Sequence, residues 1–244
     1  PVTLQLQPGE DAGDYSCSSV AVSDQYALTG FTNGNGSVYI YKRVGDIWTK
    51  CAELQASDGE SGDSFGQAVA ISGDYLIVGA TGDDDMGYNS GSAYIFRREG
   101  ESWIEEAKLL AGDGGSGDSF GSSVSISGSL AIVGAPNDDD KDTDAGSAYI
   151  FRREGTSWIM EAKELPVNSG GSSWLDDTHF GNSVSISGDY AMVGEYNQYW
   201  NGNNPGAYIY RREGATWVKE TKIFASWWSG YNSFQNRFGR SVAL

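Results

Sequence analysis

An acidic loop at residues 137–144 carries the side chains best suited to chemistry. Four aspartates alternate along it: Asp138, Asp140, Asp142 and Asp144. The oxygen ligands at positions 1, 3, 5 and 7 of a calcium-binding loop have the same spacing, and carboxylates suit Ca²⁺ better than a transition metal. The glycine at the sixth place and the distal glutamate of such loops are missing. A solvated turn rich in aspartate is therefore the alternative interpretation.

A second loop, one repeat earlier, offers Asp83, Asp85 and Asn89 at the same offsets, with Gly87 between them. Our calcium hypothesis is that the 138–144 loop binds Ca²⁺ weakly, with Asp83 and Asp85 as the corresponding metal ligands. No other cofactor is expected.

The second candidate site is a group of aromatic side chains in the long polar loops 167–179, 195–205 and 226–237. Large rings in asparagine-rich loops are typical of surfaces that stack on sugars or contact proteins. A small loop core, in which the rings cover one another, is the alternative. The predicted ligand-binding residues are Trp174, Tyr196, Tyr199, Trp200, Trp227, Trp228 and Tyr231.

Catalysis has little support in the sequence, and we expect no enzyme and no catalytic residues. His179, the only histidine, directly precedes a Phe-Gly pair at a position that Ser64 and Ser119 fill in other repeats, so its expected role is structural. No Ser/His/Asp spacing, phosphate-binding glycine loop or Cys/His cluster is present. Carboxylates are plentiful, and a glycoside-active enzyme with paired carboxylates is the third functional choice.

The charge balance excludes several partners. The 244 residues include 16 Lys and Arg against 33 Asp and Glu, a net charge of −17. Such a chain is repelled by phosphate backbones and anionic lipids, so no nucleic acid partner is expected. No apolar run of about 18 residues occurs, so no membrane insertion is expected. Hydrophobic residues make up 39% of the chain, enough for a packed core in a single domain, residues 1–244.

Internal repeats predict the elements that position these residues. Each unit has a first strand that follows a Phe-Gly pair, a Ser-Gly turn, a second strand, a third strand such as 146–151 and a fourth that starts at a tryptophan. Units of four short strands, recurring about every 50 to 60 residues, predict an all-β fold, a β-propeller of four-stranded antiparallel blades. The Phe-Gly pairs are Phe65-Gly66, Phe120-Gly121, Phe180-Gly181 and Phe238-Gly239.

Residue types also predict the place of each strand in a blade. The first strands are rich in Ser, Ala and Val, whose small side chains fit a crowded central channel, whereas the fourth strands carry long Lys and Glu side chains that suit the wet outer edge. Four tryptophans recur at one blade position and are expected to pack between blades: Trp48, Trp103, Trp158 and Trp217.

These motifs resemble the FG-GAP repeats of the integrin alpha-subunit propeller and its bacterial relatives. The GAP half is complete at Gly134-Ala135-Pro136 and partial at Gly79-Ala80 and Gly194, and the resemblance covers nearly the whole chain. It implies a secreted or cell-surface module that binds a carbohydrate or an extracellular protein, with a lectin-like or adhesive surface. In calcium-binding members an Asp-rich loop separates the FG and GAP halves. Here only a short turn such as 127–129 does, so that calcium site is not carried over.

The repeat count predicts four complete units and a fifth split between the termini. Residues 3–7 resemble a fourth strand, and a first strand follows Phe238-Gly239, but second and third strands of this unit are missing. Either the chain belongs to a longer array or another copy supplies the pairing. Open strand edges favour association. A structural subunit that self-assembles into an extracellular filament or oligomer is therefore the second functional hypothesis.

Antiparallel strand order places all long loops on one face and all short turns on the other. Nearly all the net negative charge falls on the long-loop face, which is expected to bind a ligand or a cation or to stack head to tail. Cys17 and Cys51 lie on different strands and near different faces. They are expected to be buried thiols without a bridge between them; the alternative is that one of them pairs with another chain.

Overall fold

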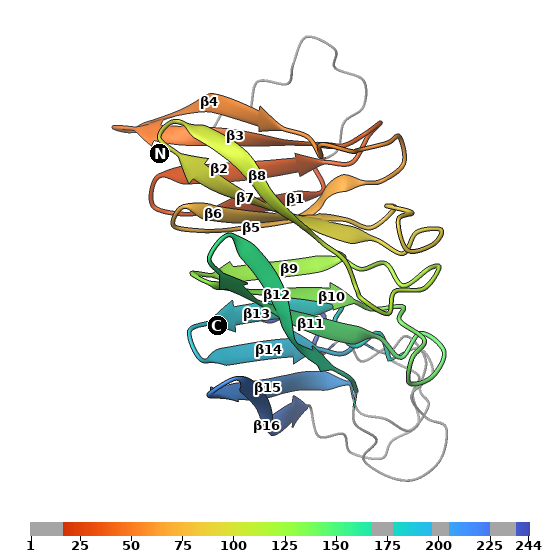
Figure 1. The fold of residues 1–244 in the computed structure, drawn as a ribbon. Helices are drawn as coiled ribbons and strands as arrows, with labels where there is room; N and C mark the ends of the chain where they lie inside the picture. Colours follow the sequence, from red (N-terminus) through yellow and green to blue (C-terminus); the bar gives the residue numbers. More distant parts are fainter. Residues whose placement is uncertain (1–16, 167–177, 197–204, 225–237) are drawn as a thin grey trace, which may run out of the picture.

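The computed structural model describes residues 17–166, 178–196, 205–224 and 238–244, which form four antiparallel four-stranded sheets, here blades 1 to 4 (Figure 1). Blade 1 contains β1 (Ser19–Val22), β2 (Tyr26–Phe31), β3 (Ser37–Val44) and β4 (Ile47–Leu54). Blade 2 contains β5 (Phe65–Ser72), β6 (Tyr75–Ala80), β7 (Ser92–Glu99) and β8 (Ser102–Leu109). Blade 3 contains β9 (Ser123–Ser127), β10 (Leu130–Ala135), β11 (Ser147–Glu154) and β12 (Ser157–Glu164). Blade 4 contains β13 (Ser183–Ser187), β14 (Tyr190–Gly194), β15 (Gly206–Glu213) and β16 (Thr216–Phe224).

The blades are arranged as in a propeller. In each sheet the spatial order of the strands is their order in the chain. First strands of successive blades lie against one another, while fourth strands barely touch, so the first strands line the axis and the fourth strands form the rim. The predicted all-β, blade-like architecture is confirmed. Within the described residues the four sheets follow one another from blade 1 to blade 4 without closing into a ring (Figure 1).

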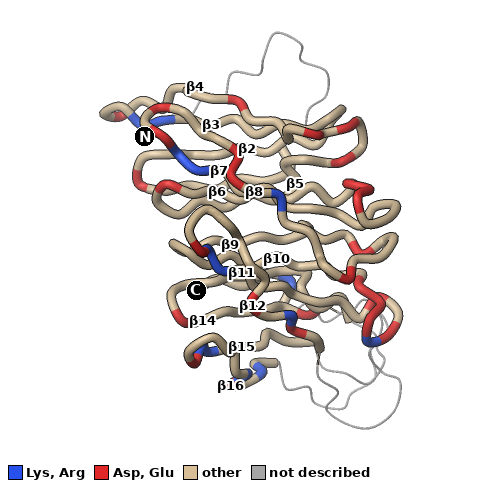
Figure 2. The backbone as a smooth tube through the Cα atoms, viewed as in Figure 1, with Lys and Arg blue, Asp and Glu red and all other residues tan. Residues whose placement is uncertain are grey.

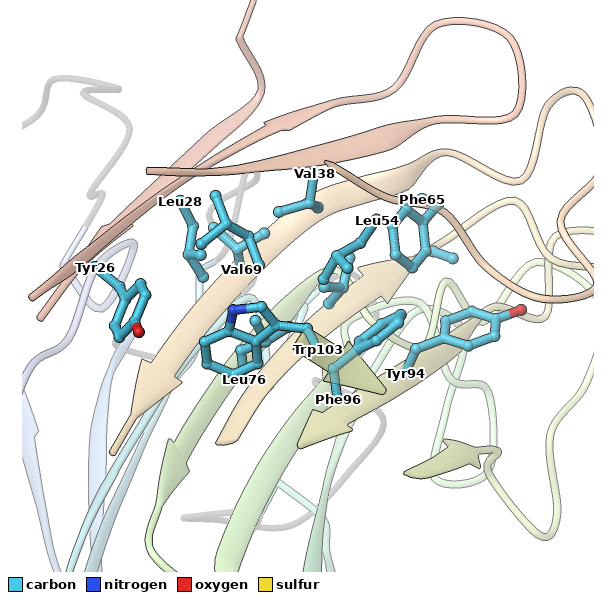
Figure 3. Packing of buried hydrophobic residues seen from close by; sticks show 13 residues of the cluster. Tyr26, Leu28, Val38, Leu54, Phe65, Val69, Leu76, Tyr94, Phe96 and Trp103 are labelled. Carbon is cyan, nitrogen blue, oxygen red and sulfur yellow. The ribbon is translucent and has the colours of Figure 1, made fainter. Parts of the chain in front are cut away.

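The main apolar clusters lie between blades, because each sheet buries a face against the next one. Between blades 1 and 2, Leu28 and Val38 pack against Phe65 and Leu76 (Figure 3). The ring of Phe65 meets Tyr94 edge to face, with 5.4 Å between centroids. Two of the repeated tryptophans, Trp103 and Trp217, are buried in such clusters and Trp158 packs against one, which confirms their expected role.

Phe-Gly and GAP glycines of neighbouring blades meet in the structure. A Cβ atom added to Gly79 in β6 would lie 1.9 Å from the carbonyl oxygen of Gly121 in the next blade, and Gly134 has the same relation to Gly181. Any side chain at these positions would push the backbones apart. The spacing of the FG and GAP halves therefore reflects close contact between successive blades.

A β-bulge interrupts the pairing of the third and fourth strands in every blade. In blade 2 it falls where Ile95 pairs with Ala107 but Phe96 pairs with Glu105, which leaves Glu106 as the extra residue. A bulge bends its strand and redirects the side chain of the extra residue. By the same registers, the extra residues of the four blades are Cys51, Glu106, Glu161 and Glu220.

Both cysteines are free and exposed, so the expectation of buried thiols is wrong. Cys51 lies on the rim strand β4, at its bulge, and Cys17 precedes the exposed strand β1. Neither position is covered by a neighbouring blade among the described residues.

Candidate functional site

The long connections of the described chain emerge at one end of the blades and the short turns at the other. The long-loop face consists of loops 55–64, 81–91, 110–122 and 136–146 together with the described residues 178–182 and 195–196 beside blade 4. Figure 2 shows that the acidic residues of these loops gather at this end. The predicted separation of long loops and short turns onto two faces is confirmed for the described residues. The acidic residues of these loops make the long-loop face negatively charged.

Asp138 anchors the loop between β10 and β11. This residue is 2% exposed, and its carboxylate accepts hydrogen bonds from Ser147 Oγ and from the hydroxyl of Tyr149, both over 2.7 Å. Lys163 Nζ lies 3.0 Å away and also contacts Asp140 at 2.5 Å and Asp113 at 2.8 Å. One half-buried ammonium group is therefore surrounded by carboxylates from two loops, an arrangement that we call a lysine cage.

Charge pairing inside the cage outweighs the cost of burial. Burial alone raises the pKa of Asp138, but hydrogen bonds from Ser147, Tyr149 and Lys163 bring it below its ordinary value. Burial alone would lower the pKa of Lys163, yet its hydrogen bonds to Asp113 and Asp140 raise it. Lys163, Asp113 and Asp138 are thus ionised together around neutral pH.

The cage is repeated in blade 2 and modified in blade 4. Lys108 Nζ lies 2.8 Å from Asp58 and 2.7 Å from both Asp83 and Asp85. The hydroxyl of Tyr94, like that of Tyr149, donates to the buried aspartate, Asp83. In blade 4, Lys222 contacts the fully buried Glu195 over 2.7 Å, and Tyr208 donates to the same carboxylate. Blade 1 has Glu53 where the others have lysine, so it lacks a cage.

The aspartates of the calcium hypothesis do not meet at one point. Asp138 and Asp140 converge on Lys163, and Asp83 and Asp85 converge on Lys108. Asp142 accepts from the backbone N–H of Thr143, and Asp144 has a φ of 46°. Across the described ranges no group of three or more His, Cys, Asp or Glu residues is placed to hold a metal ion. A Ca²⁺ ion among these carboxylates would have to displace a lysine, and its binding stays a prediction.

Backbone hydrogen bonds tie each of these loops to the next blade. Asp144 takes a left-handed conformation, which Asp and Asn tolerate, and its carbonyl accepts from His179 N–H over 3.1 Å. Asn89 has a φ of 50° and accepts in the same way from Ser119. His179 also has a positive φ, as do Ser64 and Ser119. The histidine therefore occupies a repeated structural position, as expected.

The predicted aromatic site is described only at Tyr196. This side chain is half-buried, stacks on the His179 ring with centroids 6.5 Å apart and lies 5.8 Å from the guanidinium carbon of Arg240. The remaining predicted ligand-binding residues lie outside the described residues: Trp174, Tyr199, Trp200, Trp227, Trp228 and Tyr231.

The cage lysines were missed by the sequence analysis, which placed them in water at the outer edge. That expectation is wrong, because the side chains of Lys108, Lys163 and Lys222 are only 15–18% exposed. Each lysine follows the repeated tryptophan by five residues, and a tyrosine recurs on the paired third strand. The joint recurrence of a lysine, a tyrosine and a loop acid in three repeats was the sequence signal that could have predicted the cages.

A second set of ion pairs joins the blades at the rim. Glu106, 7% exposed, accepts from Arg97 of its own blade and from Arg153 Nε and Trp158 Nε1 of the next blade, over 2.7 and 3.1 Å. The same contacts recur between Glu161 and residues Arg212 and Trp217. We call this arrangement the inter-blade clamp. Blade 1 has Cys51 at the corresponding bulge, and the Nε of Arg98 in blade 2 is buried without a partner in the described chain.

The described part of the chain contains no helix with the length and apolarity that a membrane crossing requires. Comparison with curated proteins finds no match. Among solved structures, the computationally designed Ika4 protein is similar at 10% identity with a TM-score of 0.48, over 82% of this chain and 94% of that one. Saccharomyces cerevisiae Sqt1 is similar at 10% identity and a TM-score of 0.49, over 86% of this chain and 48% of that one.

A family model described as FG-GAP repeat matches residues 48–96, 103–151 and 175–210. Each match runs from a fourth strand, or the loop after it, through the Phe-Gly pair and into the third strand of the following blade. The glycines that meet at a blade contact, such as Gly79 with Gly121, therefore lie in successive matches. Since these segments make up more than half of the sequence, the chain belongs to the FG-GAP repeat family.

Proposed function

We propose that this protein is a non-enzymatic extracellular module that binds a protein ligand, with a basic surface, on its acidic long-loop face. The observation that carries the proposal is that the lysine cages fix the inner carboxylates of two acidic loops by ion pairs to Lys108 and Lys163. The inner carboxylates Asp83 and Asp138 are fixed and buried, and the loop tips beside them stay in water.

The exposed acids have a regular geometry. Asp58, Asp85, Asp113 and Asp140 each give one contact to a lysine and keep side-chain exposures of 44–53%. These partly neutralised carboxylates lie beside the exposed Asp84 and Asp139. Loops that are ordered before binding lose less conformational entropy when a ligand arrives. Matching charge also speeds encounter with a basic partner.

Three considerations favour a binding module of this kind. FG-GAP repeats are found in integrin-like and extracellular propeller modules, which supports a location outside the cell. The FG-GAP family is generally non-enzymatic. A basic protein surface suits the described acids better than a neutral sugar, whose recognition would rest on the aromatic loops.

The test uses two double variants that remove equal charge from opposite faces. Asp84→Asn with Asp139→Asn changes exposed acids of the long-loop face, and an asparagine oxygen can still accept the bonds from Asn89 and Asp144 N–H that stabilise the loops. Glu99→Gln with Glu154→Gln changes exposed acids beside the short turns of the same two blades.

Binding to an immobilised polylysine peptide is measured by biolayer interferometry, and the variants are also applied to a glycan array. We expect the long-loop variant to lose several-fold in affinity and the short-turn variant to keep the parental value. An equal loss of polylysine affinity in both variants would mean that binding depends on net charge alone, and the proposed binding face would be wrong. Glycan binding that both variants retain, without polylysine binding, would favour a carbohydrate ligand.

A further inference from the structure

Blade 4 presents one half of an inter-blade clamp. Glu220 occupies the bulge of β16, as Glu106 and Glu161 do in their blades. Those two side chains are 7% and 5% exposed because the next blade covers them. Glu220 is 38% exposed and, among the described residues, is held by Arg211 of its own blade alone. It therefore has room for the arginine and indole donors of a further blade.

The apolar surface of blade 4 points to the same kind of partner. A groove of about 500 Å³ is lined by Met192, Ala207 and Ile223 together with residues 238–243. By strand register, these three side chains correspond to Ile77, Ala93 and Leu109 of blade 2, which are buried against blade 3. Ile223 is 44% exposed, whereas Leu109 is 3% exposed. The groove is thus the blade-facing surface of blade 4.

Blade 1 presents the complementary half. Arg43 pairs with Trp48 across β3 and β4, as Arg153 pairs with Trp158 in blade 3. The side chain of Arg43 is 47% exposed, and its described contacts are confined to Asp46 and the Gly45 carbonyl of its own turn. Unlike the buried Trp103 and Trp217, Trp48 is partly exposed. The outer side of blade 1 therefore carries the donors that Glu220 would bind.

Residues 238–244 already lie where the first strand of a fifth blade belongs. The carbonyl of Gly239 accepts from Ser183 Oγ over 2.8 Å, as the Gly181 carbonyl accepts from Ser123. The amide of Leu244 donates to Ser185 Oγ over 3.0 Å. Figure 1 shows the C-terminus beside β13. The segment is therefore docked on blade 4 in the manner of a first strand.

The same segment is a close copy of β1. The sequence Arg-Ser-Val-Ala-Leu at 240–244 matches Ser-Ser-Val-Ala-Val at 18–22, and only the C-terminal copy has the Phe-Gly pair that docks first strands. The copy at β1 is short, and its Val20 and Val22 are 71% and 69% exposed. Strand β1 thus lacks the docking pair, and its valines lie in water.

We propose that a second copy of this chain completes a fifth blade on blade 4. Its β2 pairs with segment 238–244 of the first copy, which takes the place of the second copy's own β1, and its β3 and β4 complete the blade. Arg43 and Trp48 of the second copy then bind Glu220 of the first and close the groove. Repetition gives head-to-tail assembly, independent of ligand binding on the long-loop face.

Charge exchange tests the contact. Glu220→Arg and Arg43→Glu are each expected to weaken self-association by about ten-fold or more in sedimentation equilibrium, because like charges then meet. The protein that carries both substitutions is expected to associate as the parent does. Glu154→Arg, at an exposed turn of blade 3, is the control and leaves association unchanged. A parent chain that stays monomeric at all concentrations, or a double variant that fails to regain association, would overturn the proposal.

A disulfide trap tests the strand exchange directly. In a Cys17→Ser, Cys51→Ser background, Ala27→Cys is combined with Leu244→Cys, because Ala27 pairs with Val22 and residue 244 would take the place of Val22. Oxidation is expected to give a ladder of disulfide-linked multimers on a non-reducing gel. Ser157→Cys with Leu244→Cys is the control without a ladder. Circular dichroism confirms that each variant is folded, and a folded Ala27→Cys, Leu244→Cys protein without multimers would contradict the exchange.

Discussion

Arg153 of blade 3 donates from Nε to Glu106 of blade 2 over 2.7 Å, at the rim of the molecule. Glu106 reaches it because a bulge in β8 redirects the carboxylate toward the neighbouring blade. Fourth strands of successive blades barely touch, so apolar packing at the rim is thin. A redirected carboxylate with arginine and tryptophan donors therefore supplies much of the contact between blades there.

Replacing Glu106 tests the strength of the clamp. Glu106→Gln removes the charge that faces Arg97 and Arg153, and we expect the free energy of unfolding to fall by about 2 kcal/mol. Urea denaturation measures this change. Glu99→Gln breaks an exposed ion pair in the same blade and is expected to cost less than about 1 kcal/mol. Equal losses in the two variants would show that the clamp is energetically an ordinary surface pair.

Restoring the clamp between blades 1 and 2 is expected to stabilise the protein. Cys51→Glu places a carboxylate where Arg98 Nε is buried without an acceptor in the described chain. The gain is expected to be about 1 kcal/mol, the net value of one additional hydrogen bond. Cys51→Ala, which removes the thiol without adding an acceptor, is the control and leaves stability nearly unchanged. A melting temperature for Cys51→Glu at or below that of Cys51→Ala would contradict this account.

The lysine cages predict loss of stability at both ends of the pH scale. The pKa of Asp83 and of Asp138 is lowered from 3.8 by folding, so their contribution is present above that value and disappears as the pH falls through the folded pKa. The pKa of Lys108 and of Lys163 is raised from 10.5, so their contribution is complete below that value and declines as the pH rises above it.

Chemical denaturation across the pH range measures these slopes. Lys163→Met is expected to flatten the alkaline slope and to lower stability near neutral pH, because it leaves Asp113, Asp138 and Asp140 without their shared cation. Lys141→Met changes an exposed lysine outside the cages and serves as the control. A Lys163→Met protein with the parental alkaline slope would show that the cage does not contribute.

Lys163 also bears on the predicted binding of Ca²⁺, because its ammonium group contacts two of the proposed ligands, Asp138 and Asp140. In the parent chain Lys163 Nζ stands where the loop carboxylates converge, so we expect Ca²⁺ to bind weakly, with a dissociation constant in the millimolar range. Lys163→Met removes the competing charge and is expected to tighten Ca²⁺ binding by about ten-fold or more. Isothermal titration calorimetry measures both proteins. Calcium heats that are unchanged by the substitution would place any calcium site elsewhere in the molecule.

Much of the fold could be predicted from the sequence because each repeat marks its strand ends with its own turn glycines and Phe-Gly pair. The third strand predicted at 146–151 is β11, which begins one residue later, at Ser147. The placement of all long loops on one face followed from antiparallel order alone. Strand alternation and turn residues are local signals, and four copies of them reinforce one another.

The site was harder to predict because it depends on contacts between strands. For Asp138 and Asp140, the spacing along the loop suggests a metal ion, whereas the fold places Lys163 from the end of β12 between the two carboxylates. The bulge that redirects Glu106 is likewise a property of strand pairing. Alternation along one strand assigns such residues to the wet rim and gives no sign of their partners.

The central claim is that the long-loop face binds a basic partner on acids held by the lysine cages, and amide hydrogen exchange tests it most directly. Exchange is followed by mass spectrometry with and without the polylysine probe at moderate salt. We expect added protection in loops 81–91 and 136–146 and none at turns 99–102 and 154–157. Protection confined to the short turns, or spread evenly over both faces, would contradict it.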